Sequence, residues 1–176
     1  MVNRFVAISG CSGGGKSTLL AELRRRGHAT VEEPGRRIVA AELAQGGRAL
    51  PWVDLAAFLC RAMALARADL EQARGLTGWV FFDRGLVDAA AGLQRVSGAA
   101  LPTASPYGRV VFLAPPWPEI YRTDPERRHG FDEAVAEYDH LRETYGALGH
   151  DVVTIPRADV AARADFVLRR LASADA

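Results

Sequence analysis

Short apolar runs alternate along the chain with longer segments in which apolar residues recur at helical spacing. The apolar runs predict five strands, at residues 4–9, 28–31, 79–82, 109–114 and 151–155. The helical patterns predict helices over residues 16–26, 52–74, 86–96, 131–148 and 160–171, with another beginning at Glu33 and Pro34 and ending before Gly46. Glycines follow several of the predicted helices, as expected where a helix stops.

This alternation predicts an α/β fold of three layers, with a five-stranded, mostly parallel sheet and helices on both faces. The 176 residues fit one domain, and no internal repeat divides them. Ligands of such folds bind at the carboxyl ends of the strands. Candidate functional residues are therefore expected directly after each predicted strand.

Composition changes this picture little. The formal net charge is +1 and 49% of the residues are hydrophobic, which is typical of a globular protein without a basic surface for nucleic acid. The two cysteines, Cys11 and Cys60, have no partners at metal-ligand spacing. No apolar run is long enough for a membrane span or a signal-peptide core, so we expect a cytoplasmic protein that binds neither membrane nor nucleic acid.

The strongest motif follows the first predicted strand. Residues 10–17 read GCSGGGKS, which matches the P-loop motif GxxxxGK[ST] between a strand and a helix, so the predicted three-layer fold is that of a P-loop NTPase. Glycines let backbone N–H groups turn toward phosphate, the lysine reaches the β and γ phosphates, and the serine hydroxyl ligates Mg²⁺. The residues predicted to bind ATP are Ser12, Gly13, Gly14, Gly15, Lys16, Ser17 and Thr18.

Asp83 ends the third predicted strand, next to the P-loop in the expected sheet. It is predicted to hold Mg²⁺ together with Ser17, as a Walker-B aspartate does. The alternative is that Asp83 caps the helix that starts at Leu86. Many P-loop motors carry a water-activating glutamate after this aspartate, whereas this chain has Arg84, which favours transfer of phosphate over hydrolysis.

Two polar segments supply further candidates. Arg122, Arg127 and Arg128 precede the helix at Phe131 and are predicted to stabilise the charge of a transferring phosphoryl group, unless they form only surface ion pairs. After the second strand, Glu33 is predicted to accept the proton of an acceptor hydroxyl, unless it only complements the helix dipole. The residues predicted to contact the acceptor are Glu33, Arg36, Arg37, Asp83, Arg84 and Asp88.

The segments GCSGGGKS, VEEPGRRIV, FFDRG followed by Asp88, FLAPPW and IYRTDPERRHGFDEA span nearly the whole chain. Together they resemble a family of small bacterial AAA-type predicted ATPases, which includes the kinase domain of the nicotinamide-riboside-linked NAD regulator. The resemblance implies a nucleoside-kinase-like fold with a lid, placed here at residues 119–130. Nothing in the sequence marks a nicotinamide pocket, so that activity is not transferred to this chain.

The sequence is compatible with two functions. The first is a Mg²⁺-dependent phosphotransferase that moves phosphate from ATP to a small hydroxyl compound such as a nucleoside or nucleotide. The second is a slow ATPase that acts as a nucleotide-dependent regulatory or interaction module. The expected ligands are therefore ATP, ADP and an unidentified small acceptor, and the sequence predicts no oligomeric state.

Overall fold

A single parallel sheet forms the centre of the molecule. The computed structural model describes residues 4–121 and 130–174. The strands are β1 (Phe5–Gly10), β2 (Ala29–Val31), β3 (Val80–Asp83), β4 (Val110–Ala114) and β5 (Asp151–Thr154). Their order is β2-β3-β1-β4-β5, and every described strand pairing is parallel. The predicted five-stranded α/β fold is confirmed, and β1 lies at its centre between β3 and β4.

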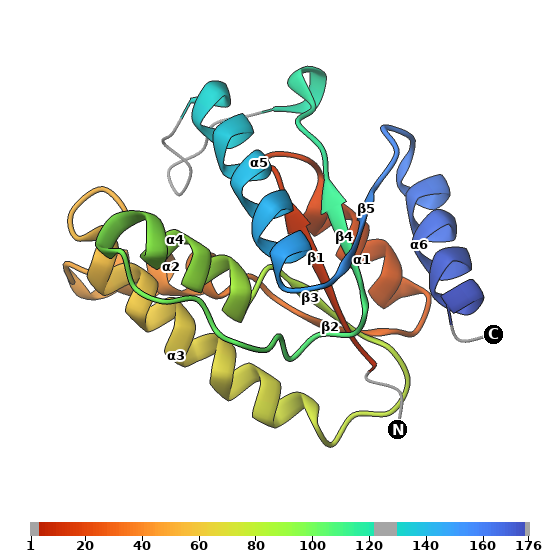
Figure 1. Cartoon of the computed structure of the whole chain (residues 1–176), viewed down its shortest axis with the longest axis horizontal. Coiled ribbons are helices and arrows are strands. Elements are labelled where there is room, and N and C mark those ends of the chain that lie inside the picture. The colour runs from red at the N-terminus through yellow and green to blue at the C-terminus, as the bar shows by residue number, and fades with distance from the viewer. Residues whose placement is uncertain (1–3, 122–129, 175–176) are drawn as a thin grey trace.

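Helices cover both faces of the sheet. They are α1 (Lys16–Arg25), α2 (Pro34–Gln45), α3 (Leu55–Ala73), α4 (Leu86–Ser97), α5 (Phe131–Ala147) and α6 (Val160–Ala174), with a short 3₁₀ helix η1 (Pro118–Ile120). Helices α1 and α6 lie on one face, and α3, α4 and α5 lie on the other (Figure 1). Within the described residues, no helix is both long and apolar enough to cross a membrane.

The strands are buried on both sides because their residues alternate between two cores. Val6 and Ile8 of β1 pack in the core under α1 and α6, whereas Ala7 between them packs in the core under α3 and α5. Phe81 and Phe82 of β3 divide in the same way. This double burial fixes the register that places Asp83 beside Ile8 and Ala114 beside Gly10.

Helix α3 begins three residues later than the sequence pattern predicts. Asp54 is the N-cap, and its side chain accepts a hydrogen bond from the backbone N–H of Ala57 at 2.9 Å. This side-chain cap satisfies a donor that would otherwise be unpaired at the helix start. Trp52, predicted as the first helical residue, lies half-buried in the preceding turn.

Candidate functional site

The loop between β1 and α1 has a backbone that only glycine adopts readily. Gly10, Gly13 and Gly15 have φ angles of 102°, 79° and 77°. A Cβ on Gly10 would lie 2.5 Å from the backbone oxygen of Ala114, so this position also requires the absence of a side chain. No side chain caps the start of α1, which leaves its first N–H groups directed at the loop, as an anion site requires.

Lys16 closes this loop from inside. Its side chain is buried, and Nζ donates to the carbonyl oxygen of Cys11 at 3.0 Å. Burial lowers the pKa of Lys16, and the positive charge of Arg84 lowers it further. A cation held at such a cost in solvation is stabilised when phosphate oxygens approach it.

Asp83 and Ser17 meet at the ends of β3 and the P-loop. Ser17 Oγ donates to Asp83 Oδ2 at 3.2 Å, while Asp83 Oδ1 is buried and has no hydrogen-bond partner in the described part of the chain. Burial raises the pKa of Asp83 to about 6, against the attraction of Lys16. A hydroxyl and an orphaned carboxylate oxygen suit Mg²⁺, a hard cation that prefers oxygen ligands. The alternative role as a helix cap is wrong, because Gly85 is the N-cap of α4 and no side chain caps it.

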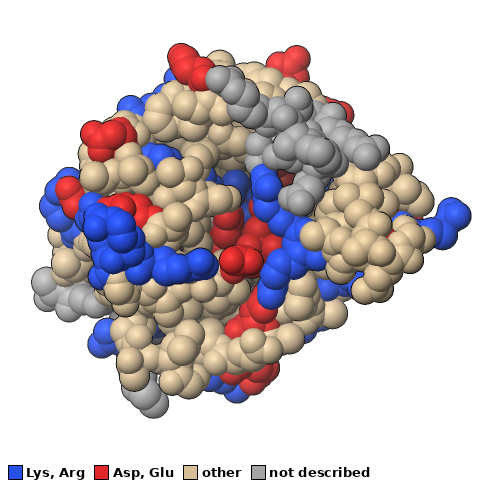
Figure 2. All heavy atoms as spheres, turned by 180° about the vertical axis from the view of Figure 1, so that it is seen from behind, with Lys and Arg blue, Asp and Glu red and all other residues tan. Residues whose placement is uncertain are grey.

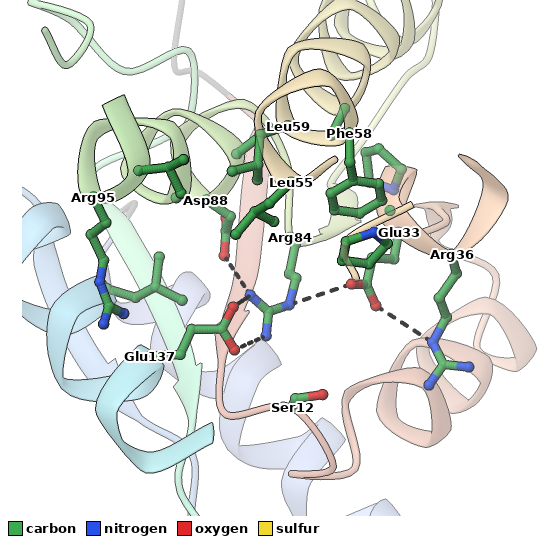
Figure 3. Close-up of a pocket in the computed structure, with 18 of the residues that line it drawn as sticks. Ser12, Glu33, Arg36, Leu55, Phe58, Leu59, Arg84, Asp88, Arg95 and Glu137 are labelled. Carbon is green, nitrogen blue, oxygen red and sulfur yellow. Dashed lines mark hydrogen bonds and ion pairs between the residues drawn. The ribbon is translucent and has the colours of Figure 1, made fainter. Parts of the chain in front are cut away.

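Arg84 connects the P-loop to a neighbouring cavity. Its two terminal nitrogens donate to Glu137 at 2.8 Å each, and Nη2 also donates to the carbonyl oxygen of Gly10 at 3.0 Å. Glu33 and Asp88 lie 3.6 and 3.7 Å from the guanidinium (Figure 3). Burial opposes the charged form, but these carboxylates outweigh it and raise the pKa of Arg84. Its φ of 57° is strained for a residue with a side chain.

The cavity has a volume of about 580 Å³, within the range of small-molecule sites. Ser12 of the P-loop lines it together with residues of α2, α3, α4 and α5. Leu55, Phe58 and Leu59 of α3 provide an apolar wall opposite the charged groups around Arg84 (Figure 3). On the face of the molecule opposite to Figure 1, acidic and basic side chains gather in a hollow (Figure 2).

The predicted acceptor residues divide into two groups. Glu33, Arg36, Arg84 and Asp88 line the cavity, whereas Arg37 and Asp83 do not. Asp88 is buried there, and its oxygens accept hydrogen bonds from Ser9 and from Tyr145, so it supports Arg84 more than it faces the opening.

The assignment of Arg37 is corrected by the structure. Its side chain does not line the cavity and instead forms an ion pair with Asp69 of α3. The reason is geometric, because a residue adjacent to Arg36 on a helix is rotated by about 100° around the axis.

Arg122, Arg127 and Arg128 lie outside the described residues. The described start of the predicted lid contains η1 and Tyr121, whose ring would lie 2.6 Å from a Cβ on Gly13. The root of this segment therefore packs directly on the P-loop.

Sequence reasoning did not identify two residues of the site. Glu137 lies on α5 between the buried Ala134 and Leu141, so a carboxylate within an apolar helical face was the available signal. Arg163 of α6 is buried, donates to the carbonyl oxygen of Gly15 at 3.0 Å and lies over the ring of Trp117 at 5.5 Å. Burial lowers the pKa of Arg163. No motif marks this arginine, which reaches the P-loop only through the fold.

Comparison with known proteins places this geometry in a family. A family model described as AAA domain matches residues 5–163. No curated protein matched in a sequence search. Among solved structures, deoxyadenosine kinase from M. mycoides with bound dATP is 17% identical with a TM-score of 0.65, and the match covers 96% of this chain and 98% of that one. Shikimate kinase from Acinetobacter baumannii in complex with shikimate is 18% identical with a TM-score of 0.55, covering 97% and 93%. These kinases share the fold.

Proposed function

The chain belongs to the AAA domain family, and from this premise we propose that it is a Mg²⁺-dependent phosphotransferase that moves the γ-phosphate of ATP to a hydroxyl group of a small molecule. The kinase-like fold supports this class of reaction. Kinship with the nicotinamide-riboside-linked NAD regulator stays a prediction from the sequence.

One observation carries the proposal. The cavity is lined both by Ser12 of the P-loop and by Glu33, so an acceptor bound in it would reach the site predicted for the triphosphate. Arg84 ties these two parts together through Gly10 and Glu33. A motor ATPase needs room for a water beside the γ-phosphate, whereas a cavity of about 580 Å³ suits a whole molecule.

The residues divide the chemistry as follows. Lys16 and the loop N–H groups hold the phosphates in line with the acceptor. Ser17 and Asp83 would hold Mg²⁺, which neutralises charge on the phosphates when it is bound. Glu33 accepts the proton of the acceptor hydroxyl while the oxygen of that hydroxyl bonds to the γ-phosphorus. The bond between the γ-phosphorus and the bridging oxygen of ADP breaks at the same time. ADP and a phosphorylated acceptor leave the site.

The ligands bound in the structural neighbours guide the choice of compounds. A deoxyadenosine kinase with bound dATP and a shikimate kinase in complex with shikimate share this fold. We therefore propose nucleosides and small polyhydroxyl compounds as the first acceptors to test, alongside nucleotides and aminoglycosides.

The test is transfer of label from γ-labelled ATP to such a panel. We expect at least one labelled acceptor, and we expect Glu33→Gln to slow its formation by about 10²- to 10⁴-fold, the usual contribution of a general base. Glu32→Gln is the matched control, because Glu32 is an exposed neighbour that does not line the cavity. Release of phosphate at the same slow rate with every compound would refute transfer and favour the ATPase module.

A further inference from the structure

The bidentate pair between Arg84 and Glu137 bears on which charge an acceptor in the cavity can carry. A guanidinium offers five N–H donors. Here Glu137 takes one from each terminal nitrogen, the carbonyl oxygen of Gly10 takes another, and the remaining directions face Glu33 and Asp88. Three donors of Arg84 are therefore hydrogen-bonded to oxygen atoms of the protein, and the other two face carboxylates at 3.6 and 3.7 Å.

The surrounding charges point in the same direction. Among the described residues that line the cavity, carboxylates outnumber guanidinium groups: Glu33, Asp88, Glu133 and Glu137 against Arg36, Arg84 and Arg95. Arg36 lies 3.5 Å from Glu33, and Arg95 is exposed at the end of α4. In the inner part of the cavity, Arg84 is thus surrounded by the carboxylates of Glu33, Asp88 and Glu137 (Figure 3).

An anionic acceptor would meet two costs at this point. It would have to displace Glu137 from a bidentate pair, which is among the stronger hydrogen-bonded arrangements in proteins. It would also be repelled by the carboxylates that remain. A neutral acceptor meets neither cost, and its apolar part can pack on Leu55 and Phe58.

We propose that Glu137 is a specificity-determining residue that restricts the acceptor to neutral or cationic hydroxyl compounds by keeping Arg84 occupied. This inference rests on the proposed function, because only a phosphotransferase has an acceptor. Its physical content, rejection of anions next to Arg84, can be measured without any transfer.

The probe is inorganic phosphate, titrated into full-length protein whose P-loop is first filled with Mg²⁺ and a non-hydrolysable ATP analogue. Calorimetry of the analogue alone shows whether the P-loop is occupied. We expect Glu137→Gln to bind phosphate at least about tenfold more tightly than the wild type, since Arg84 then loses its bidentate carboxylate partner. Glu143→Gln, on the exposed face of α5, is expected to match the wild type.

Glu137→Asp separates selection by charge from a merely structural role. It keeps the carboxylate but shortens it, so it should reject phosphate as the wild type does. A gain in phosphate affinity for Glu137→Asp as large as that for Glu137→Gln would overturn the proposal. If Glu137→Gln does not fold, the wild type still decides, because tight phosphate binding beside an occupied P-loop would also overturn it.

A second readout uses two acceptors that differ in one charge, uridine and orotidine. Wild-type protein is expected to favour uridine in kcat/KM, and Glu137→Gln to reduce the ratio by about tenfold or more. Absence of transfer to every compound would count against the proposed function, while the phosphate titration would still report on Glu137.

Discussion

Asp83 carries a buried and unfavourable charge beside the P-loop. It is 5% exposed, one of its oxygens has no partner among the described residues, and burial raises its pKa to about 6 from an ordinary value of 3.8. A raised pKa means that the protonated acid favours the folded state. This contribution to stability is fully present below about pH 4 and is lost as the pH rises through about 6. The protein therefore keeps at neutral pH a carboxylate that a bound cation would stabilise.

Asp83→Asn is expected to separate stability from binding. At pH 8 with EDTA present, the free energy of unfolding of the variant should exceed that of the wild type by up to about 3 kcal/mol, because the buried charge is gone. The difference should shrink as the pH falls from about 6 to 4. Denaturant unfolding measures it, and the Mg·ATP-induced melting shift should be lost in the same variant. A variant less stable than wild type at pH 8 would contradict this account of Asp83.

Arg163 gives a second prediction at this scale. Arg163→Met is expected to lower the free energy of unfolding by about 1–2 kcal/mol through loss of the hydrogen bond to Gly15 and the contact with Trp117. ATP affinity should fall as well, since the carbonyl of Gly15 is then unsupported. Arg169→Met, an exposed arginine on the same helix, is the control. Equal ATP affinities in the two variants would show that Arg163 does not position the loop.

At the scale of elements, Glu22 of α1 pairs with Arg26, the residue that joins the end of this helix to α6. Glu22 accepts hydrogen bonds from Arg25 and from Arg26, and Arg26 also pairs with Asp165 of α6. The hydrogen bond from Arg25, and to a smaller extent the one from Arg26, lowers the pKa of Glu22 to about 2. A lowered acid pKa stabilises the fold above the ordinary value of 4.5, and that stability is lost as the pH falls through about 2.

Glu22→Gln is therefore expected to lower the melting temperature at pH 7, with a gap that closes as the pH falls from about 4.5 toward 2. Glu71→Gln serves as the control, because Glu71 pairs with Arg74 where both side chains are exposed. Thermal melts across this pH range measure the gap. A gap that stays constant with pH would show that the pairs of Glu22 add nothing to stability.

The elements themselves were largely predictable from the sequence, for a physical reason. Strands buried on both faces read as apolar runs, and the run before the P-loop glycines locates β1 without ambiguity. The start of α3 was misplaced because apolar spacing continues through Trp52, while the cap at Asp54 is a local side-chain preference. Glu137 and Arg163 could not be assigned from the sequence, since each meets its partner only when α5 or α6 packs on the sheet.

At the scale of the whole molecule, the sheet brings a phosphate loop and a cavity to one edge. Arg84 contacts Gly10 of β1, Glu33 before α2, Asp88 of α4 and Glu137 of α5. Four segments distant in sequence thus meet at one buried cation beside the P-loop. The proposed phosphoryl transfer requires a triphosphate to lie next to this point.

The most direct test of that claim is calorimetric titration of Mg·ATP into wild-type protein and into Lys16→Ala. We expect measurable binding to the wild type and a loss of affinity of about a hundredfold or more in the variant, the scale of losing one charged hydrogen-bond donor to phosphate. Circular dichroism of the variant checks that the fold is intact. Equal affinity in the two proteins would mean that ATP, if it binds, does not lie in the loop of residues 10–17.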